Sequence, residues 1–177
     1  LKKLVTLELF FKMPPNCINF NFGCIPNGVR DLIIYTHGCE DILTRLGNIP
    51  SNVTYLELNG PHQEPIKPGI IPNTVKTLVL NNYNHALEVG TIPYGIVNLI
   101  IGGQYNIMIP IGVIPSSVKI IDLGDIYNHP LPPGVIPIGT KYIYFSENFN
   151  QPLEENSIPN GTIFIMFGYS FNQSLRT

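Results

Sequence analysis

Residues 114–135 read IPSSVKIIDLGDIYNHPLPPGV, and this stretch decides the fold because its plan recurs along the chain. Its opening dipeptide, Ile-Pro, returns in register at Pro26, Pro50, Pro72, Pro93, Pro115, Pro137 and Pro159. These successive prolines lie 24, 22, 21, 22, 22 and 22 residues apart. A fixed period of this size indicates a repeat architecture, in which each unit stacks on the next.

Apolar side chains recur at the sixth and eighth positions after each proline, and at the third position in all repeats but the last two, where Thr140 and Thr162 stand. In the stretch quoted above, these residues are Val118, Ile121 and Leu123. The alternation from the sixth to the eighth position is the period of a short strand whose alternate side chains face one interior. A single unit cannot enclose these side chains, so neighbouring coils must bury them against like residues.

We therefore expect a mainly β fold with little helix: a right-handed solenoid of about eight repeats of about 22 residues, with one parallel sheet. The repeats start near residues 1, 25, 49, 71, 92, 114, 136 and 158. They form a single domain over residues 1–177, expected to be a fragment because the chain opens without Met. Near the twelfth position an aromatic residue precedes Asn, as in Tyr127-Asn128. We expect this Asn to be buried and to pair with backbone groups of the next coil.

Composition restricts the classes of function. Charged residues make up 12 % of the 177 residues, and the formal net charge of −2 argues against a nucleic-acid binder, which is usually strongly basic. No apolar stretch reaches the roughly 20 residues that span a bilayer, and no signal peptide is visible. Cys17, Cys24 and Cys39 form neither a disulfide framework nor zinc-ligand spacing, which favours a reducing compartment inside a cell.

The repeating unit, Ile-Pro-x-x-Val-x-x-Leu-x-Leu-Gly-x-x-Phe/Tyr-Asn-x-Pro-Leu-x-x-Gly, resembles the FNIP repeat. Residues 114–131 and 149–153 match it most closely, and the resemblance is strong from Ile49 onward. It implies a leucine-rich-repeat-like solenoid of a kind found mainly in social amoebae and in giant viruses such as mimivirus. It also implies an arm for protein interaction, often joined to an F-box or a kinase. With an F-box, the array would be the substrate-recognition arm of a ubiquitin-ligase adaptor.

The candidate site lies on the strand face. In such a solenoid the fourth, fifth and seventh positions of each repeat face outward, and many of them are apolar here although solvent should surround them. We expect these residues to bind a protein partner: Tyr55, Glu57, Lys119, Asp122, Lys141, Tyr142, Tyr144, Phe164 and Met166. Two alternatives stay open: a further segment or a second subunit of the same protein covers the patch, or the patch is unused.

Catalysis and metal binding find little support in the sequence. No nucleophile-elbow, phosphate-loop or zinc-protease motif occurs, so we expect no enzyme and no cofactor. The four histidines fall in the outer turns, and without carboxylate or cysteine neighbours they are expected to pack there rather than to bind metal: His37, His62, His85 and His129.

The sequence thus predicts a scaffold for protein–protein interaction, in the cytoplasm or, for a viral protein, the host cytoplasm. We expect protein partners on the strand face and neither nucleic-acid nor membrane partners. The alternative is a structural solenoid that self-associates through uncapped ends, because open strand edges pair readily. A carbohydrate-binding solenoid is a third reading, which rests only on the tyrosines of the strand face.

Overall fold

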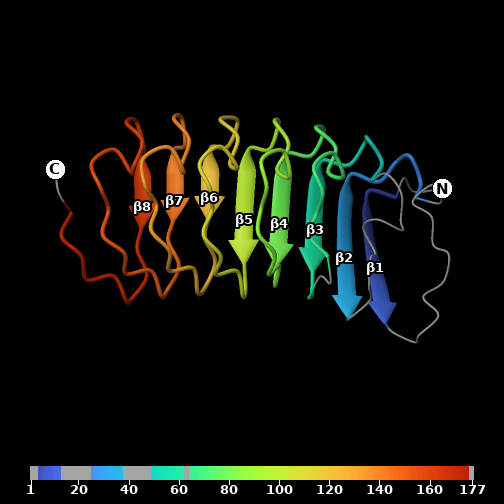
Figure 1. Ribbon diagram of the computed structural model, residues 1–177. Helices are drawn as coiled ribbons and strands as arrows, with labels where there is room; N and C mark the ends of the chain where they lie inside the picture. The colour runs from blue at the N-terminus through green and yellow to red at the C-terminus, as the bar shows by residue number, and fades with distance from the viewer. Residues whose placement is uncertain (1–3, 13–24, 38–48, 62–63, 176–177) are drawn as a thin grey trace.

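The computed structural model describes residues 4–12, 25–37, 49–61 and 64–175, which are built around one parallel sheet of eight strands (Figure 1). The strands lie in chain order, so each coil places its strand beside that of its neighbour. Their bounds are β1 (Thr6–Lys12), β2 (Asp31–His37), β3 (Tyr55–Asn59), β4 (Thr77–Asn81), β5 (Asn98–Gly102), β6 (Ile120–Asp122), β7 (Tyr142–Tyr144) and β8 (Phe164–Met166). The described residues contain no helix, in keeping with the frequent Pro and Gly.

The strand register confirms the alignment of the repeats. Leu56 pairs with Leu78, Leu78 with Leu99, and Leu99 with Ile121, all of which stand at the sixth position after a proline. The prediction of about eight repeats is slightly too high, because the solenoid makes about six turns. The regular period begins only at the third strand: Thr6, Asp31 and Tyr55, which pair in register, lie 25 and 24 residues apart, whereas Tyr55 and Thr77 lie 22 apart.

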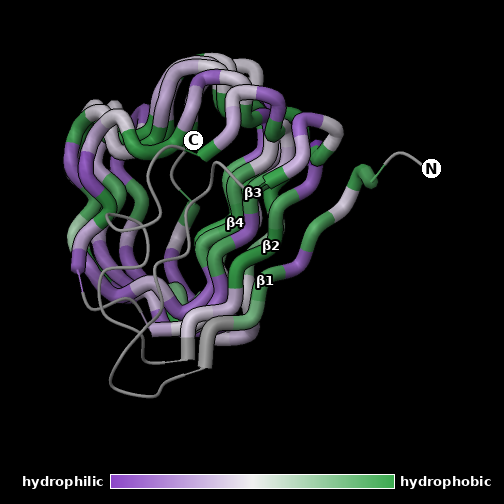
Figure 2. The backbone as a smooth tube through the Cα atoms, turned by 90° about the vertical axis from the view of Figure 1, so that its right-hand side faces the viewer, coloured by the Kyte–Doolittle hydropathy of each residue, from purple (hydrophilic) through white to green (hydrophobic). Residues whose placement is uncertain are grey.

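The coils wind in the predicted right-handed sense. All strands point the same way in Figure 1, with β1 and β8 at opposite ends of the sheet. Seen along the axis from the β1 end, the chain runs down the sheet, crosses at the bottom and returns on the opposite side (Figure 2). This clockwise path advances away from the viewer, which defines a right-handed solenoid.

Each Ile-Pro dipeptide begins a tight turn that leads the chain into its strand. The proline carbonyl accepts a hydrogen bond from the amide three residues later, as in Val53 N to Pro50 O (3.0 Å) and Val118 N to Pro115 O (3.1 Å). The ring of proline lies outside the sheet ladder, where its missing N–H costs nothing. The repeated dipeptide therefore sets the start of each strand.

Columns of like side chains fill the interior between the sheet and the returning chain. The sixth-position column and the third-position column are fully buried through the middle of the array: Val53, Val75, Ile96, Val118, Leu56, Leu78, Leu99, Ile121 and Ile143. Every coil covers the apolar side chains of the coil before it, so burial depends on stacking rather than on the single repeat.

A second column consists of stacked aromatic rings. The centroids of Tyr83 and Tyr105 lie 6.3 Å apart, as do those of Tyr105 and Tyr127, and Phe149 and Phe171 follow at 6.1 Å. Burial raises the pKa of Tyr127 to about 12, because the charged phenolate would lose its water. From Tyr83 to Phe149 the aromatic residue at this position is thus a core residue.

The asparagines that follow these rings form a ladder from coil to coil. The side-chain oxygens of Asn106, Asn128 and Asn150 each accept the backbone N–H of the asparagine in the next coil, at 2.9 Å. The predicted pairing is confirmed, but these side chains are half-buried or exposed rather than buried. The ladder runs along the outer turns because an exposed amide N–H there has no strand partner.

Candidate protein-binding face

The candidate site is the outer face of the sheet, where alternate strand residues point away from the core. In β3, Leu56 and Leu58 are fully buried and the residues between and beside them are half-buried. Among the described residues, no group of three His, Cys, Asp or Glu is placed to hold a metal ion. The described part of the chain also has no helix that is long and apolar enough to cross a membrane.

Seven of the nine predicted site residues come from three adjacent coils, those of β6, β7 and β8. Lys119 precedes β6, Asp122 is its last residue, and Lys141 precedes β7. The remaining four residues lie on the last two strands: Tyr142 and Tyr144 on β7, Phe164 and Met166 on β8. Tyr55 and Glu57 lie on β3, with β4 and β5 between them and the other seven. The predicted site therefore divides into two clusters on one face.

The larger cluster contains an aromatic patch, which comprises Tyr142, Tyr144, Phe164 and Met166. The ring of Phe164 lies 6.5 Å from that of Tyr142 and 5.5 Å from that of Tyr144. Tyr142, Phe164 and Met166 are 38 %, 43 % and 49 % exposed. Tyr142 lies between β6 and β8 in the sheet, so its exposure belongs to the face and not to the end of the stack.

The backbone holds this patch in a rigid frame. The N–H of Lys141 donates to Lys119 O at 2.8 Å, and the carbonyl of Lys141 accepts the N–H groups of Ile163 and Phe164 at 2.8 and 3.1 Å. β7 is bonded to a strand on each side and β8 is bonded to β7, so these strands cannot shift against one another without breaking bonds of the ladder. The outward rings therefore lie on a preorganised surface.

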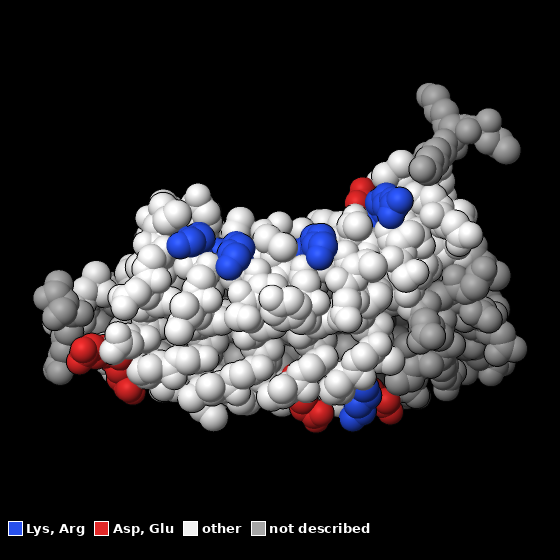
Figure 3. Space-filling model, turned by 90° about the horizontal axis from the view of Figure 1, so that it is seen from above, with Lys and Arg blue, Asp and Glu red and all other residues white. Residues whose placement is uncertain are grey.

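A row of cations runs along the edge of the sheet where the strands begin (Figure 3). This cationic row comprises Arg30, Lys76, Lys119 and Lys141, each at the fourth position of its repeat. Each side chain donates a hydrogen bond to a backbone carbonyl in the turn of the following coil. In chain order, the acceptors are Asn52 O at 3.0 Å, Gly95 O at 3.2 Å, Gly139 O at 3.2 Å and Gly161 O at 2.9 Å. The predicted site did not include Arg30 and Lys76, although their shared position in the repeat is a signal that could have found them.

The smaller cluster satisfies its own charge. The hydroxyl of Tyr55 donates to Glu57 Oε2 at 2.5 Å, and Glu57 Oε1 accepts from Asn59 and Asn81 at 3.0 and 3.2 Å. Burial raises the pKa of Tyr55, and the hydrogen bond to Glu57 and its negative charge raise it further. Both oxygens of Glu57 are thus occupied, which leaves this carboxylate less available to a partner.

Asp122 has a local structural task. Its Oδ1 accepts the backbone N–H of Gly124 at 2.9 Å. Gly124 has a φ of +69°, and a Cβ at this position would collide with the carbonyl oxygen of Ile101. Asp122 therefore fixes the turn that ends β6 close to the aromatic patch.

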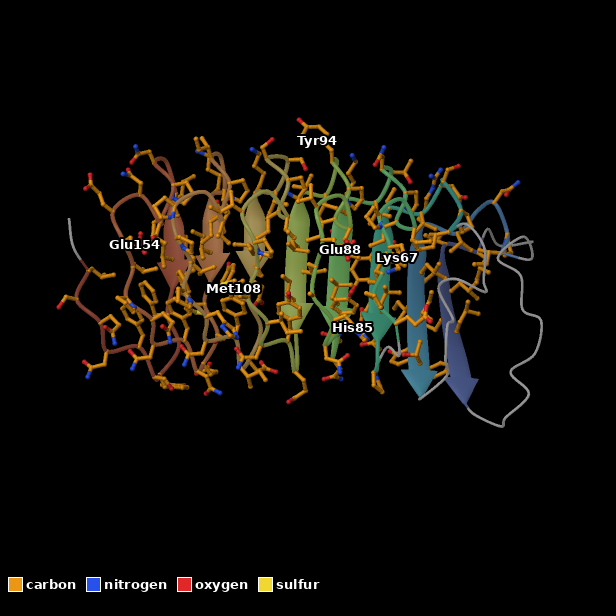
Figure 4. The ribbon with its side chains drawn as sticks, in the orientation of Figure 1. Lys67, His85, Glu88, Tyr94, Met108 and Glu154 are labelled. Carbon is orange, nitrogen blue, oxygen red and sulfur yellow. The ribbon has the colours of Figure 1, made fainter. Side chains whose placement is uncertain are left out.

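The described histidine rings lie against the aromatic column, away from the strand face. His85 packs edge-on to Tyr83 at 5.7 Å, and His129 packs on Tyr127 at 5.8 Å with its Nε2 2.9 Å from Asn106 O. Figure 4 shows His85 near the end of the coil where the strands finish, whereas Tyr94 projects from the opposite end. His62 and the three cysteines lie outside the described residues, as does the side chain of His37.

Comparisons with known proteins agree with this geometry. The family model described as FNIP Repeat matches residues 44–82, 83–125, 127–170 and 149–177. A solved structure titled "The crystal structure of CroV588 a novel circular LRR protein structure", from a giant virus, is 25 % identical with a TM-score of 0.75. The match covers 93 % of this chain and 23 % of that one, so the chain spans about a quarter of its length. Among curated proteins none matches. The repeat register and the family model together show that the chain belongs to the FNIP repeat family.

Proposed function

We propose that the array is a scaffold for protein–protein interaction that binds its partner through the outer face of β6–β8. The aromatic patch is the observation that carries this proposal. Exposed, clustered aromatic residues on a rigid face are typical of protein-binding surfaces, because they bury a large area at little entropic cost. The repeat fold supports the same function, since solenoids present extended surfaces and hold them by stacking alone.

Substitution of the patch tests this function. Affinity purification with wild-type protein should recover a partner that is lost with the double variant Tyr144→Ala/Phe164→Ala. The matched control is Tyr94→Ala, which removes a 71 % exposed tyrosine at the strand-start turns, outside the face. Circular dichroism verifies that all three proteins are folded. Identical sets of bound proteins for the wild type and the double variant would refute the proposal.

The resemblance to FNIP arrays supports a narrower role, an intracellular substrate-recognition arm of an F-box-type ubiquitin-ligase adaptor without enzymatic activity of its own. In this role the strand face holds the substrate, while a companion domain contacts the ligase. Mass spectrometry of proteins that co-purify with the full-length protein tests it. Ubiquitin-ligase components among them support the adaptor, and their absence from a preparation that retains other partners contradicts it.

A second candidate function, self-assembly of the solenoid, is favoured by the surface of the last strand. Ile165 is 37 % exposed, whereas Ile143, the equivalent residue one coil earlier, is fully buried. A further coil or a second copy stacked on β8 would bury Ile165. The similar structure is described as that of a circular protein, which supports this candidate. Light scattering over a range of concentrations tests this function, since self-assembly requires the mass to grow and a constant monomer mass excludes it.

A further inference from the structure

We propose that the face of β6–β8 recognises an acidic, apolar segment of a partner protein. Carboxylates of this segment bind between Lys119 and Lys141, and its apolar side chains cover the aromatic patch. This inference rests on the proposed scaffold function and adds the chemistry of the partner. One observation supports it: among the described residues, two cations without a carboxylate partner lie beside an exposed aromatic surface on the same three coils.

The two lysines form a preorganised pair. Lys119 and Lys141 occupy the same position in consecutive coils, and their Nζ atoms make the same contact, with Gly139 O and Gly161 O. Their ammonium groups are therefore held about one strand spacing, roughly 4.8 Å, apart. Within the described residues neither ammonium has a carboxylate partner. An anion bound between them would relieve their mutual repulsion.

The carbonyl contacts leave capacity for such an anion. An ammonium group has three N–H donors, and the turn carbonyl uses one of them. The contact also holds the long side chain in place, which lowers the entropy lost when a ligand binds. The bonds within the solenoid thus position the charges without neutralising them.

The apolar part of the surface is continuous with this pair. Tyr142 follows Lys141 directly in the sequence, and Phe164 pairs with Tyr142 on the next strand. Met166 pairs with Tyr144 in the same way and extends the surface along β8. A bound segment that crosses these strands meets cations at the edge of the sheet and aromatic side chains below them.

The charge around the pair favours a protein segment over a nucleic acid. The chain has a net charge of −2, and the carboxylate of Asp122 lies on β6 beside Tyr144 on β7. A phosphate backbone would be repelled by this carboxylate. The face of β6–β8 also lacks the broad basic surface that nucleic-acid binders use. A peptide can place its acidic residues on the lysines and its apolar residues elsewhere.

Selection of peptides by the intact protein tests the inference. A random 12-residue peptide library is selected on immobilised protein, and enriched peptides are synthesised and measured by fluorescence anisotropy. We expect enrichment of Asp or Glu beside Leu, Phe or Tyr. The variant Lys119→Gln/Lys141→Gln, which retains donors for the turn carbonyls, should weaken binding about five- to tenfold, as expected for loss of two surface ion pairs. Lys67→Gln, a cation outside the row, should leave it unchanged.

The outcomes separate this inference from the proposed function. Enriched peptides without acidic residues, or equal affinity for Lys119→Gln/Lys141→Gln, would overturn acidic recognition. If Phe164→Ser still abolished their binding, the scaffold function would stand. A library that yields no binder would count against both. The protein could instead bind heparin or a single-stranded oligonucleotide and no peptide, and lose this binding in the variant Lys119→Gln/Lys141→Gln. That result would overturn the acidic segment and identify a polyanion as the ligand.

Discussion

Alanine substitutions along one column of isoleucines test whether stacking between coils holds the molecule together. Ile121, Ile143 and Ile165 stand at the same position of consecutive repeats and pair in register across β6, β7 and β8. The first two are fully buried, whereas Ile165, on the last strand of the described sheet, is 37 % exposed. The three substitutions are chemically identical, so any difference in their effect reports the coverage by neighbouring coils.

The magnitudes follow from burial. Replacement of a fully buried Ile by Ala costs about 2–5 kcal/mol, of which part is the cavity left in packed surroundings. Ile165 retains about two-thirds of its burial, and a gap beside it opens to solvent instead of forming a closed cavity. We therefore expect Ile121→Ala and Ile143→Ala to lower the free energy of unfolding by about 3 kcal/mol, and Ile165→Ala by about 1 kcal/mol.

Urea unfolding followed by far-ultraviolet circular dichroism measures these changes. The protein is kept dilute and its mass is checked by light scattering, because an end-to-end contact would cover Ile165. Equal, small losses for all three variants would refute the stacked core. A loss of about 3 kcal/mol for Ile165→Ala in a verified monomer would refute the argument that β8 is uncovered.

Three further substitutions, two of them with a matched control variant, test the turns and the aromatic column. Asn128→Ala should lower the free energy of unfolding by about 1–2 kcal/mol, because the N–H of Asn150 loses its acceptor, whereas Asn128→Asp keeps an oxygen there and should cost less in the same urea assay. Gly124→Ala should cost about 2 kcal/mol or more, since its left-handed φ and the carbonyl of Ile101 both oppose a Cβ; Gly69→Ala, with a φ of +87° and open space, should cost only about 1 kcal/mol in thermal unfolding. The raised pKa of Tyr127 adds stability that is fully present below pH 10 and is lost as the pH rises to about 12, so Tyr127→Phe should flatten the fall in stability over this range, as measured by urea unfolding at each pH.

The interior could be predicted from the sequence because stacking places the same packing requirement on every coil. Each inward position meets its own equivalent in the next coil, so Val53, Val75 and Val118 must resemble one another. The number of turns was harder to predict, since the first repeats keep their strand residues but place Thr6, Asp31 and Tyr55 further apart in the sequence than the regular period does. A count of the strand segments in the sequence therefore gives more repeats than the solenoid has regular turns.

The candidate site was only partly predictable for a different reason. The sequence places Glu57 on the outer face, but it does not show that Asn59 and Asn81 converge on this carboxylate from two strands. It likewise places Lys119 outward without showing that the side chain reaches Gly139 in the next turn. Both contacts depend on the pitch of the coil and on the path of each turn, which the periodicity of the residues does not contain.

These contacts change which outward residues can act on a partner. Glu57 and Asp122 direct their oxygens to groups of the chain itself, whereas the lysines of β6 and β7 and the rings of Tyr142 and Phe164 keep capacity for further contacts. Packing dictates the inward residues, so they resemble one another in every coil. Outward residues are free of this demand, and selection for binding can act on them separately. Specificity in such an array must therefore lie in the outward residues, which include the rings of Tyr142 and Tyr144 on β7 and of Phe164 on β8.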